Sequence, residues 1–412
     1  MSPRKLSVRD LELKGTRVFV RVDFNVPLQG GGVADDARLR ASLPTLRLIL
    51  ERGGRPILAS HLGRPKGRPV PEMSLRPVAD RLTSLIGRPV RMALDCVGPE
   101  AESQSRELRD GEILLLENLR FHPEEEKNDE GFAGALAALA DQYVNDAFGT
   151  AHRAHASVVG ITRRLRPSAG GLLLDQEVTM LSRLREAPDK PYVAILGGAK
   201  VSDKLDLIHH LIARVDAILI GGAMAYTFLQ AKGVAVGGSR VEIDLVTHAR
   251  SLLARAAESG VRIELPRDHI VAASPAPGAP SRATSGAEIE PGLIGLDVGP
   301  RTREAFGEEV RRARTIFWNG PLGLFEVPPY DQGTNALARA IASIRVFSVV
   351  GGGDSVAAVN RQGLADRFTH VSTGGGASLE FLSGVDLPGI VALTDAPAEP
   401  AGPGRKKQSG EA

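Results

Sequence analysis

The sequence predicts an α/β protein with two doubly wound parallel-sheet (Rossmann-like) domains joined by a helical hinge. Short runs rich in Val, Ile and Leu alternate with longer segments whose apolar residues lie three and four positions apart, and this alternation continues through both halves of the chain. Strand–helix alternation is typical of a parallel sheet covered by helices on both faces. A chain of 412 residues also exceeds what one hydrophobic core usually supports, so two domains are expected.

The expected elements follow one another in order along both halves. Short apolar runs are expected to form strands, and segments of helical spacing are expected to form helices. The expected strands span residues 18–22, 56–59, 113–116, 143–146, 192–196, 217–220, 316–318 and 346–350. The expected helices span residues 38–50, 75–86, 132–140, 203–213, 245–259 and 335–344. Each half therefore contains its own set of strands and helices.

A helical connector is expected between the domains. Residues 168–171 interrupt the alternating pattern, and residues 172–186 have the pattern of one amphipathic helix that ends before Ala187-Pro188. The predicted bounds are residues 1–171 for an N-terminal domain, 172–186 for the interdomain helix or hinge and 187–383 for a C-terminal domain. Residues 384–396 are expected to pack back on the N-terminal domain.

Two stretches of biased composition are expected to lie outside the cores. Residues 274–292 hold many Pro, Gly and Ala residues, which predicts a surface loop. Residues 397–412 are rich in proline and glycine and then basic, with Arg405-Lys406-Lys407. Such a composition predicts a disordered tail.

Charge and cysteine content exclude several classes of function. The net charge is only +2, from 51 basic and 49 acidic residues, whereas nucleic-acid binding needs a basic face. No apolar run approaches the ~20 residues of a membrane helix, and the N-terminus has no signal-peptide pattern. We therefore expect a cytoplasmic protein without a nucleic-acid or membrane partner. The single cysteine, Cys96, excludes an intramolecular disulfide and a zinc site built from thiolates.

Basic side chains follow the predicted strands of the first half. One Arg or His in a loop is usually structural or solvated, but in open α/β sheets ligands bind at the carboxyl ends of strands. Guanidinium groups hold small anions by bidentate hydrogen bonds. The clustered residues are Arg21, Arg38, His61, Arg64, Arg120, His122, His152, Arg153 and His155. Together with Asp23 and Asn25, which suit ligand hydroxyls, they indicate a small-anion site.

Glycine-rich loops follow strands of the second half. Residues 351–353 and 374–376 lie between a strand and a helix, where backbone N–H groups suit a polyphosphate. Asp354 is interpreted either as a helix cap or as a ligand of Mg²⁺. Neither Gly-x-x-x-x-Gly-Lys-Ser/Thr nor Gly-x-Gly-x-x-Gly occurs, which disfavours a P-loop and an NAD-dependent dehydrogenase.

Lys200 and Lys204 follow the glycines of residues 197–198. Spaced four apart at an expected helix start, they should share one face. Solvated surface lysines are the ordinary interpretation of such a pair. Two cations at a helix N-terminus oppose the dipole, however, so we favour a bound anion that compensates them.

In chain order, these segments resemble the phosphoglycerate kinase family over about residues 5–395. The motifs that carry the resemblance are VRVDFNVP, DDARLRASLPT, SHLGRPKG, LLENLRFHPEEEKND, NDAFGTAHRAHAS, ILGGAKVSDK, IGLDVGP, WNGPLGLFE, VVGGGDS and VSTGGGASLEFL. The chain departs from the family's pattern at Ser355, where threonine is usual, and at Leu293-Ile294, which replace Trp-Met. Ser355 keeps a hydroxyl group, so we expect it to keep the role of helix cap. Every charged role of the pattern is filled.

The resemblance implies site residues in both domains. In the N-terminal domain it implies that 3-phosphoglycerate is bound by Asp23, Asn25, Arg38, His61, Leu62, Gly63, Arg64, Arg120, His152 and Arg153. In the C-terminal domain it implies nucleotide binding by Lys204, Gly299, Asn319, Glu326, Gly351, Gly352, Gly353, Asp354 and Ser355. Asp354 would hold Mg²⁺, and the catalytic residues Arg38 and Lys200 would flank the transferred phosphoryl group.

The implied activity is reversible Mg²⁺-dependent phosphoryl transfer between 1,3-bisphosphoglycerate with ADP and 3-phosphoglycerate with ATP, in glycolysis. The carboxyl acceptor is already ionised, so we assign histidines 61, 122, 152 and 155 to anion binding and loop structure rather than to acid–base catalysis. We expect a monomer whose hinge closes on both ligands. The alternative is a non-catalytic sensor of the same fold that binds a phosphorylated metabolite and a nucleotide. Lys200 and Asp354 favour the enzyme.

Overall fold

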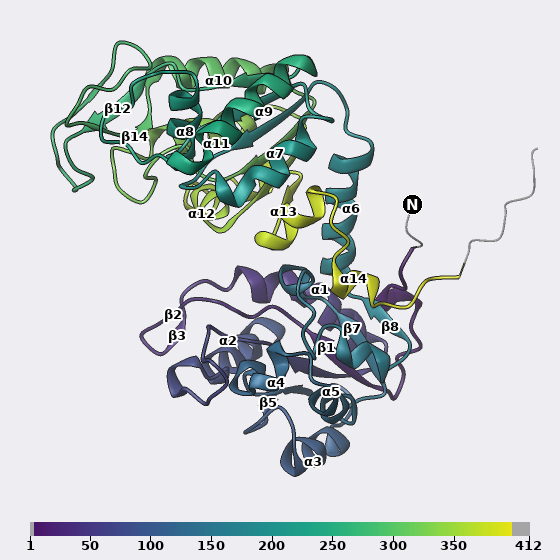
Figure 1. Cartoon of the computed structure of the whole chain (residues 1–412). Coiled ribbons are helices and arrows are strands. Elements are labelled where there is room, and N and C mark those ends of the chain that lie inside the picture. The colour runs from purple at the N-terminus through teal and green to yellow at the C-terminus, as the bar shows by residue number, and fades with distance from the viewer. Residues whose placement is uncertain (1–3, 398–412) are drawn as a thin grey trace, which may run out of the picture. The chain divides into compact units, whose positions relative to one another are not determined.

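The computed structural model describes residues 4–397, which divide into two compact units (Figure 1). Unit 1 comprises the described residues through Asp146, then Ala154–Leu172, and the described residues from Gly389 onward. Unit 2 comprises Ala147–Arg153 and Leu173–Pro388. Of the expected tail, residues 398–412 lie outside the described residues.

Unit 1 is built on a six-stranded sheet with the order β5-β6-β4-β1-β7-β8, in which every neighbouring pair is parallel. Its strands are β1 (Arg17–Arg21), β4 (Arg55–Ala59), β5 (Val90–Met92), β6 (Ile113–Leu115), β7 (Gln142–Asn145) and β8 (Ser168–Gly170). A small hairpin adds β2 (Leu28–Gln29) and β3 (Gly32–Val33). The helices are α1 (Ala37–Glu51), α2 (Arg76–Ile86), α3 (Pro99–Glu107), α4 (Pro123–Glu126), α5 (Glu130–Ala137) and α14 (Pro388–Val391).

Unit 2 is built on a second six-stranded parallel sheet, with the order β11-β10-β9-β15-β16-β17. Its strands are β9 (Tyr192–Leu196), β10 (Ala217–Ile220), β11 (Arg262–Glu264), β15 (Thr315–Asn319), β16 (Phe347–Gly351) and β17 (His370–Val371). Its helices are α6 (Leu172–Glu186), α7 (Leu205–Leu211), α8 (Met224–Ala231), α9 (Val246–Glu258), α10 (Pro300–Arg312), α11 (Gln332–Ala342), α12 (Gly353–Arg361) and α13 (Gly376–Leu382). The predicted α/β fold with two parallel sheets is confirmed.

One sheet of unit 2 was not expected. The strands β12 (His269–Ala272), β13 (Ser281–Ala283) and β14 (Ile294–Val298) form an antiparallel sheet in the order β13-β12-β14. The predicted loop of residues 274–292 therefore contains a strand. Because all three residues of β13 are exposed, this edge strand lacks the apolar run that marks a buried strand.

Short 3-10 helices complete the chain at turns between these elements. Those of unit 1 are η1 (Val8–Asp10), η2 (Pro71–Met73), η3 (Leu119–Phe121) and η5 (Gly160–Arg163). Those of unit 2 are η4 (Phe148–Thr150), η6 (Ser202–Lys204), η7 (Ile243–Leu245) and η8 (Ala365–Arg367). They matter here because η3 and η6 carry residues of the predicted sites.

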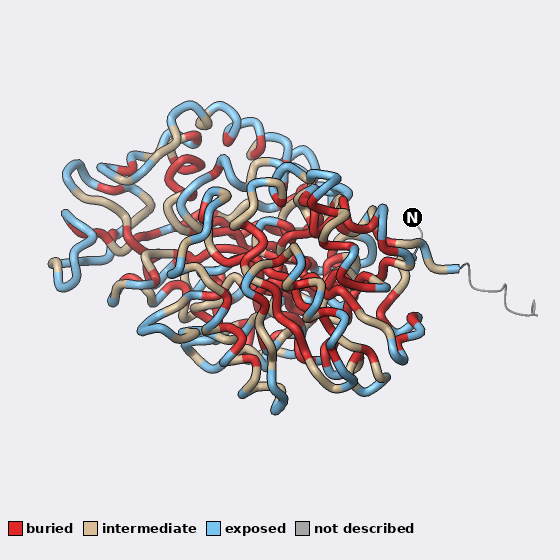
Figure 2. Tube along the Cα trace, turned by 90° about the horizontal axis from the view of Figure 1, so that it is seen from below, coloured by how far each residue is buried: buried red, intermediate tan, exposed pale blue. Residues whose placement is uncertain are grey.

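Each sheet lies within its own hydrophobic core, and Figure 2 shows buried residues inside the molecule and exposed residues on the outer loops. All residues of β9, β15 and β16 are buried, as expected for strands covered on both faces. No helix within residues 4–397 combines the length and the apolar character that crossing a bilayer requires.

The C-terminal segment of the described chain contacts the start of the chain. Thr394 accepts a hydrogen bond from the backbone N–H of Leu6 at 2.8 Å, and Lys5 Nζ lies 2.7 Å from Asp395 Oδ1. The Oγ1 atom of Thr394 also accepts a hydrogen bond from Ser168 N–H, at 3.0 Å. These contacts place the last described residues in unit 1, next to η1 and β8.

Candidate functional site

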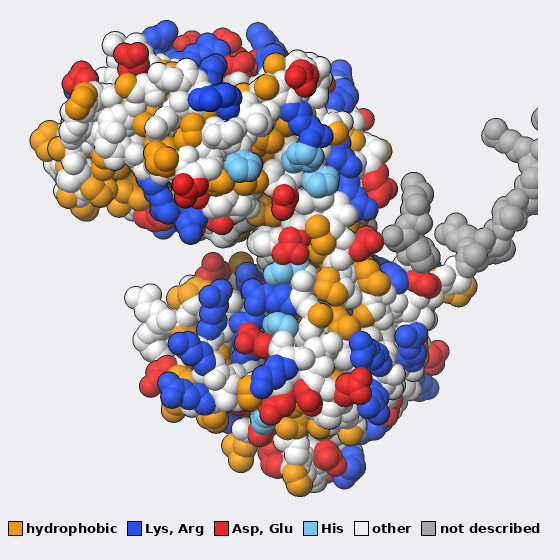
Figure 3. Space-filling view, viewed as in Figure 1, with side chains coloured by type: hydrophobic (Ala, Val, Ile, Leu, Met, Phe, Trp, Pro, Cys, Tyr) orange, Lys and Arg blue, Asp and Glu red, His pale blue; other side chains and the backbone are white. Residues whose placement is uncertain are grey.

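Polar side chains of unit 1 lie at the carboxyl end of its parallel sheet. Asp23 and Asn25 follow β1, His61 follows β4, and Arg120 lies in η3 after β6. Because these strands are parallel, the loops after them meet at one edge of the sheet. Figure 3 shows Lys, Arg and His side chains gathered along the upper rim of unit 1 in that view. The edge therefore has the charge of an anion-binding site.

Arg38 and Asp23 form an ion pair at this edge. Arg38, in the first turn of α1, donates a hydrogen bond from Nη1 to Asp23 Oδ2. The Asp23 residue is only 8% exposed, whereas 33% of the Arg38 side chain is accessible. The pair therefore orients the guanidinium group and leaves other N–H groups free to face a ligand.

The loop after β4 is held by amide side chains. Asn25 Oδ1 accepts a hydrogen bond from Gly63 N–H at 2.9 Å, and Asn118 Oδ1 accepts one from Leu62 N–H at 3.2 Å. Asn118 Nδ2 donates to the Leu62 carbonyl at 2.8 Å, and Arg120 Nη1 donates to the Gly63 carbonyl at 2.9 Å. The backbone of Leu62 and Gly63 is therefore engaged within the protein, and these two residues set the shape of the loop.

His61 is a buried, neutral imidazole. Its side chain lies beneath the edge, with Nδ1 at 3.3 Å from Arg21 Nη2. Burial lowers the pKa of His61 well below its usual value, and the positive charges of Arg21, Arg120 and Arg38 lower it further. His61 can therefore offer a hydrogen bond to a ligand but no positive charge at neutral pH.

A buried network fixes Arg21 below this site. Arg21 Nε donates to Ser157 Oγ at 2.8 Å, and the Ser157 N–H donates to Glu125 Oε2 at 2.9 Å. Burial raises the pKa of Glu125, while the charge of Arg21 opposes that rise. Sequence reasoning missed Ser157, Glu125 and Asn118. The available signal was the polar Asn118 and Glu125 inside the LLENLRFHPEEEKND motif.

Two predicted anion ligands, His152 and Arg153, lie on the segment that groups with unit 2. Arg153 Nε donates to His152 Nε2 at 3.2 Å, and a Cβ on Gly376 would lie 4.0 Å from His152 Nε2. His152 therefore lies beside Arg153 and close to the second glycine loop. Arg64, in unit 1, is exposed at the end of the β4 loop.

Several glycine-containing loops of unit 2 contact one another directly through their main chains. Gly198 N–H donates to the Pro321 carbonyl at 2.9 Å, and a Cβ on Gly197 would collide with the same carbonyl oxygen. Gly222 has φ of +67° and its Cβ position would meet Gly198. Glycine is therefore required here by close contact between backbones, and the loop edge presents main-chain groups to a ligand.

The first turn of α12 differs from the expectation. Its N-cap is Gly352, with φ of +88°, and no side chain caps it. The interpretation of Asp354 as a helix cap is therefore wrong, and so is the helix-capping role expected for Ser355. Ser355 Oγ instead accepts a hydrogen bond from Gly320 N–H at 2.6 Å, while the Asp354 residue is exposed.

Asn319, at the end of β15, presents a free donor to this turn. It is 3% exposed, and its Nδ2 atom makes no hydrogen bond within the described part of the chain. A Cβ on Gly352 would lie 2.9 Å from that nitrogen. A buried amide donor without a partner costs free energy, so it indicates a group that a ligand should satisfy.

The two lysines do not share a helix face, because the local helix begins later than expected. Lys200 precedes η6 in irregular backbone, and Lys204 ends η6 as the N-cap of α7. Glu242, which sequence reasoning missed, accepts hydrogen bonds from Ser202 Oγ at 2.7 Å and from the Val201 N–H, and so shapes this turn.

Lys204 lies over the first glycine loop, with Nζ at 3.7 Å from a Cβ placed on Gly198. Burial lowers the pKa of Lys204, and the negative charges of Asp203 and Asp354 act in the opposite direction. The lysine is therefore a partly desolvated cation that lies within electrostatic reach of Asp354.

The remaining predicted nucleotide residues occupy other positions in unit 2. Gly299 is the N-cap of α10, where a Cβ would collide with the Asp268 carboxylate. Glu326 is exposed in the segment after β15, next to Phe325, whose ring is covered by the Arg361 guanidinium at 5.1 Å. Of the predicted nucleotide-binding residues, the contacts described above bring together the glycine loops, Asn319 and Lys204.

The chain is similar to known proteins along most of its length. The family model of phosphoglycerate kinase matches residues 8–385. The phosphoglycerate kinase of Moorella thermoacetica is 54% identical over 391 residues, covering 95% of this chain and 99% of that protein. That of Solibacter usitatus is 56% identical over 393 residues, covering 94% and 99%.

Solved structures agree with these sequence matches. Phosphoglycerate kinase from Coxiella burnetii has a TM-score of 0.84 and 39% identity, covering 94% of this chain and 98% of that chain. The enzyme from Pyrococcus horikoshii has a TM-score of 0.85 and 34% identity over the same shares. Fold and sequence similarity thus extend over nearly the whole chain.

Proposed function

The chain belongs to the phosphoglycerate kinase family, and on that premise we propose which of its residues bind the substrates and stabilise the transfer. Its function is phosphoryl transfer between 1,3-bisphosphoglycerate with ADP and 3-phosphoglycerate with ATP, a reaction of glycolysis. The alternative of a non-catalytic sensor is not favoured, because the relatives carry the name of the enzyme. The observation that carries the site assignment is the pair of polar sheet edges, one basic and one rich in glycine.

The basic edge of unit 1 is assigned to the phosphoglycerate. Arg38, Arg64 and Arg120 supply charge, and Asp23 and Asn25 suit the substrate's hydroxyl group. The set assigned in unit 1 is Asp23, Asn25, Arg38, His61, Leu62, Gly63, Arg64 and Arg120, and the resemblance adds His152 and Arg153, which group with unit 2. The neutral state of His61 supports a hydrogen-bonding role, and the engaged backbone of Leu62 and Gly63 supports a role in loop shape.

The glycine-rich edge of unit 2 is assigned to the nucleotide. The free Nδ2 donor of Asn319 and the uncapped N-terminus of α12 are the groups that would bind its phosphates. The assigned set is Lys204, Gly299, Asn319, Glu326, Gly351, Gly352, Gly353, Asp354 and Ser355. For Ser355 the bond to Gly320 supports a role in holding the loop.

Asp354 is assigned to Mg²⁺. Its exposed carboxylate in the first turn of α12 fits this ion, which proteins commonly bind through one or two carboxylates together with substrate phosphates. When bound, Mg²⁺ would neutralise charge on the nucleotide phosphates. Lys204, within the field of Asp354, would complete the positive surroundings of the phosphates.

The chemistry of the acceptor explains why positive side chains are the main contribution of the protein to phosphoryl transfer. The carboxylate of 3-phosphoglycerate is ionised near neutral pH, so no general base has to activate it. The barrier arises because a carboxylate approaches a polyphosphate, and the cations of Arg38 and Lys200 would offset that repulsion during in-line transfer. Helix α6 is the proposed hinge that lets the two bound ligands meet.

A binding experiment tests the assignment without turnover. Calorimetric titration of the full chain with 3-phosphoglycerate alone should show at least tenfold weaker binding for Arg64→Ala. The control is Arg106→Ala, which removes an exposed arginine of α3 paired with Glu102. Equal affinities of the two variants would contradict the assignment of Arg64, whatever the activity of the protein.

On the basis of the family resemblance, we also propose that the protein is a cytoplasmic monomer that uses Mg²⁺. Large apolar side chains exposed on the described surface are few and scattered: Leu94, Ile243, Val385 and Val391. This distribution supports a monomer, because stable interfaces usually bury larger apolar patches. Sedimentation of the purified chain at a mass near 43.6 kDa is the expected result.

A further inference from the structure

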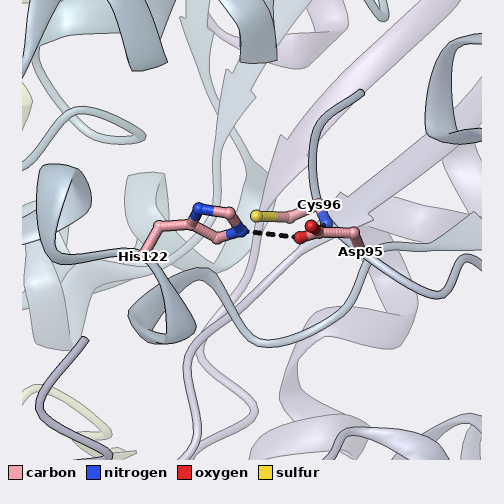
Figure 4. Close-up of side chains that lie close together, drawn as sticks. All are labelled: Asp95, Cys96 and His122. Atoms are coloured by element: carbon pink, nitrogen blue, oxygen red, sulfur yellow. Dashed lines mark hydrogen bonds and ion pairs between the residues drawn. The ribbon is translucent and has the colours of Figure 1, made fainter. Parts of the chain in front are cut away.

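Three potential metal ligands converge in unit 1 from two separate segments. Asp95 and Cys96 lie in the bend that follows β5, and His122 lies between η3 and α4. A carboxylate oxygen, a thiol sulfur and an imidazole nitrogen lie within 4.8 Å of one another. Figure 4 shows that the three side chains point toward a common centre. His122 was expected in the small-anion cluster, but its Nε2 pairs with Asp95, and the substrate set proposed above contains none of these three residues.

The surrounding fold holds these side chains in place. The His122 ring stacks on Phe132, with ring centroids 5.2 Å apart, and His122 Nε2 lies 2.7 Å from Asp95 Oδ1. The Cys96 N–H donates to the same Asp95 oxygen at 2.6 Å. Cys96 is 1% exposed, so its sulfur lies in the protein wall, while half of the Asp95 side chain faces solvent. One side of the cluster is therefore buried and the other is open.

We propose that Asp95, Cys96 and His122 bind a thiophilic divalent cation of the Zn²⁺ class, with water as the fourth ligand. Thiolate, imidazole and carboxylate are all established ligands of zinc, and three protein ligands with one open position form a common zinc geometry. A thiolate is a poor ligand for Mg²⁺, which prefers oxygen. The single cysteine excludes a site with several thiolates, but one thiolate is sufficient for this mixed site.

A tetrahedral site requires the three ligand atoms, now all within 4.8 Å of one another, to adjust their separations. Two ligands bonded at ~2.0–2.1 Å to a tetrahedral ion lie ~3.3 Å apart, so the His122 and Asp95 atoms, now at 2.7 Å, would separate by roughly half an ångström. The exposed Asp95 side chain has room to make this movement. The ion would displace the thiol proton, which would pass to solvent, and His122 would bind as a neutral imidazole through Nε2 with its one N–H proton on Nδ1.

A metal-free hydrogen-bonded cluster is the competing account. In it, the buried thiol stays neutral, because burial raises its pKa well above the usual value and Asp95 raises it further. That account predicts no sulfur–metal bond at any accessible metal concentration. The two accounts therefore differ in an observable that does not depend on enzymatic activity.

X-ray absorption at the zinc edge tests the proposal on the full wild-type chain with one equivalent of Zn²⁺ and no nucleotide. The expected shell contains one sulfur at ~2.3 Å and nitrogen or oxygen ligands at ~2.0 Å. Because Cys96 is the only cysteine, a thiolate sulfur in the shell identifies it. A shell of nitrogen and oxygen alone would overturn the proposal.

Variants provide an independent check. Chelator competition should show at least tenfold weaker Zn²⁺ binding for Cys96→Ser and for Asp95→Asn, with circular dichroism used to verify folding. The matched control is His248→Gln, an exposed histidine on α9, which should bind Zn²⁺ as the wild type does. Co²⁺ should produce a thiolate charge-transfer absorption in the wild type that a large excess of Mg²⁺ does not remove. Unchanged Zn²⁺ affinity in folded Cys96→Ser would refute the site.

Discussion

Glu177 and His370 are 193 positions apart in the chain, yet His370 Nε2 lies 2.8 Å from Glu177 Oε2 in the interior of unit 2. Glu177 is fully buried on α6, and its other oxygen accepts hydrogen bonds from the N–H of Thr373, at 2.6 Å, and from its Oγ1, at 2.9 Å. Ser372 Oγ donates to the carboxylate as well, at 2.8 Å. One carboxylate therefore ties α6 to the loop that precedes the second run of glycines.

Replacing Glu177 with Ala should destabilise unit 2. The change leaves the buried donors of His370, Ser372 and Thr373 without their acceptor, and the loss of one partner in a buried polar network typically costs about 3–5 kcal/mol. Urea unfolding followed by circular dichroism measures the loss. Gln176→Ala, a change at the exposed neighbour on the same helix, should stay within about 0.5 kcal/mol of the wild type. Equal stability of the two variants would show that the network contributes nothing.

Arg38→Ala and Lys200→Ala should each lower kcat by a hundredfold or more while the fold persists. Removal of one preorganised charge that stabilises the transition state typically costs ~3 kcal/mol. A coupled assay of ADP formed from 3-phosphoglycerate and MgATP measures the effect.

Exposed basic residues outside the assigned sites are the matched controls for this pair. Arg47→Ala on α1 and Lys232→Ala at the end of α8 should retain kcat within about twofold, because neither faces an assigned ligand. Near-normal turnover of Lys200→Ala would remove Lys200 from the mechanism. Arg38→Ala needs the additional check of thermal stability, since it leaves Asp23 without its ion-pair partner.

The rate should be insensitive to histidine titration. Burial and the neighbouring arginines hold the pKa of His61 well below its usual value, so His61 stays neutral between pH 6 and 8. The acceptor carboxylate is ionised throughout the same range. We therefore expect kcat under saturating ligands to be flat from pH 6 to 8, and a bell-shaped profile with a histidine pKa would contradict this mechanism.

Because of Asp297, the free energy of unfolding of unit 2 should fall as pH rises. Burial raises the pKa of Asp297 to about 7, against an ordinary value of 3.8, although the N–H groups of Gly333 and Val298 oppose that rise. Between these two pH values the folded state binds more protons than the unfolded state, so this residue's stabilising contribution is lost as pH rises from about 4 to about 7.

Asp297→Asn removes the titration and keeps one acceptor for the backbone donors. The difference in free energy of unfolding between variant and wild type should shift in favour of the variant by up to a few kcal/mol from pH 4 to pH 7. His269, whose pKa burial lowers to about 4, remains in both proteins, so its effect cancels in the difference. A difference that is constant with pH would mean that Asp297 titrates as an ordinary carboxyl group.

Local sequence accounts for the main elements. The predicted helix of residues 172–186 matches α6, because its apolar spacing and the flanking Gly171 and Pro188 are local signals. The all-apolar runs of β9 and β16 mark strands buried on both faces, and the loops after them contain the predicted glycines. The same local signals located the basic clusters and supplied the motifs that resemble the family.

Contacts between distant segments account for the rest. Asn118 holds Leu62, Ser355 holds Gly320, and Glu177 holds Thr373, and no spacing along the chain predicts such pairs. The expected lysine face and the side-chain caps of α12 were wrong, because α7 begins only at Leu205, after both lysines, and the N-cap of α12 is Gly352, which has no side chain. Periodicity reports which face of an element is apolar. The partners of a buried polar group depend on which loops the sheet brings together, and this is why Asp95 and Cys96 meet His122 only in the folded chain.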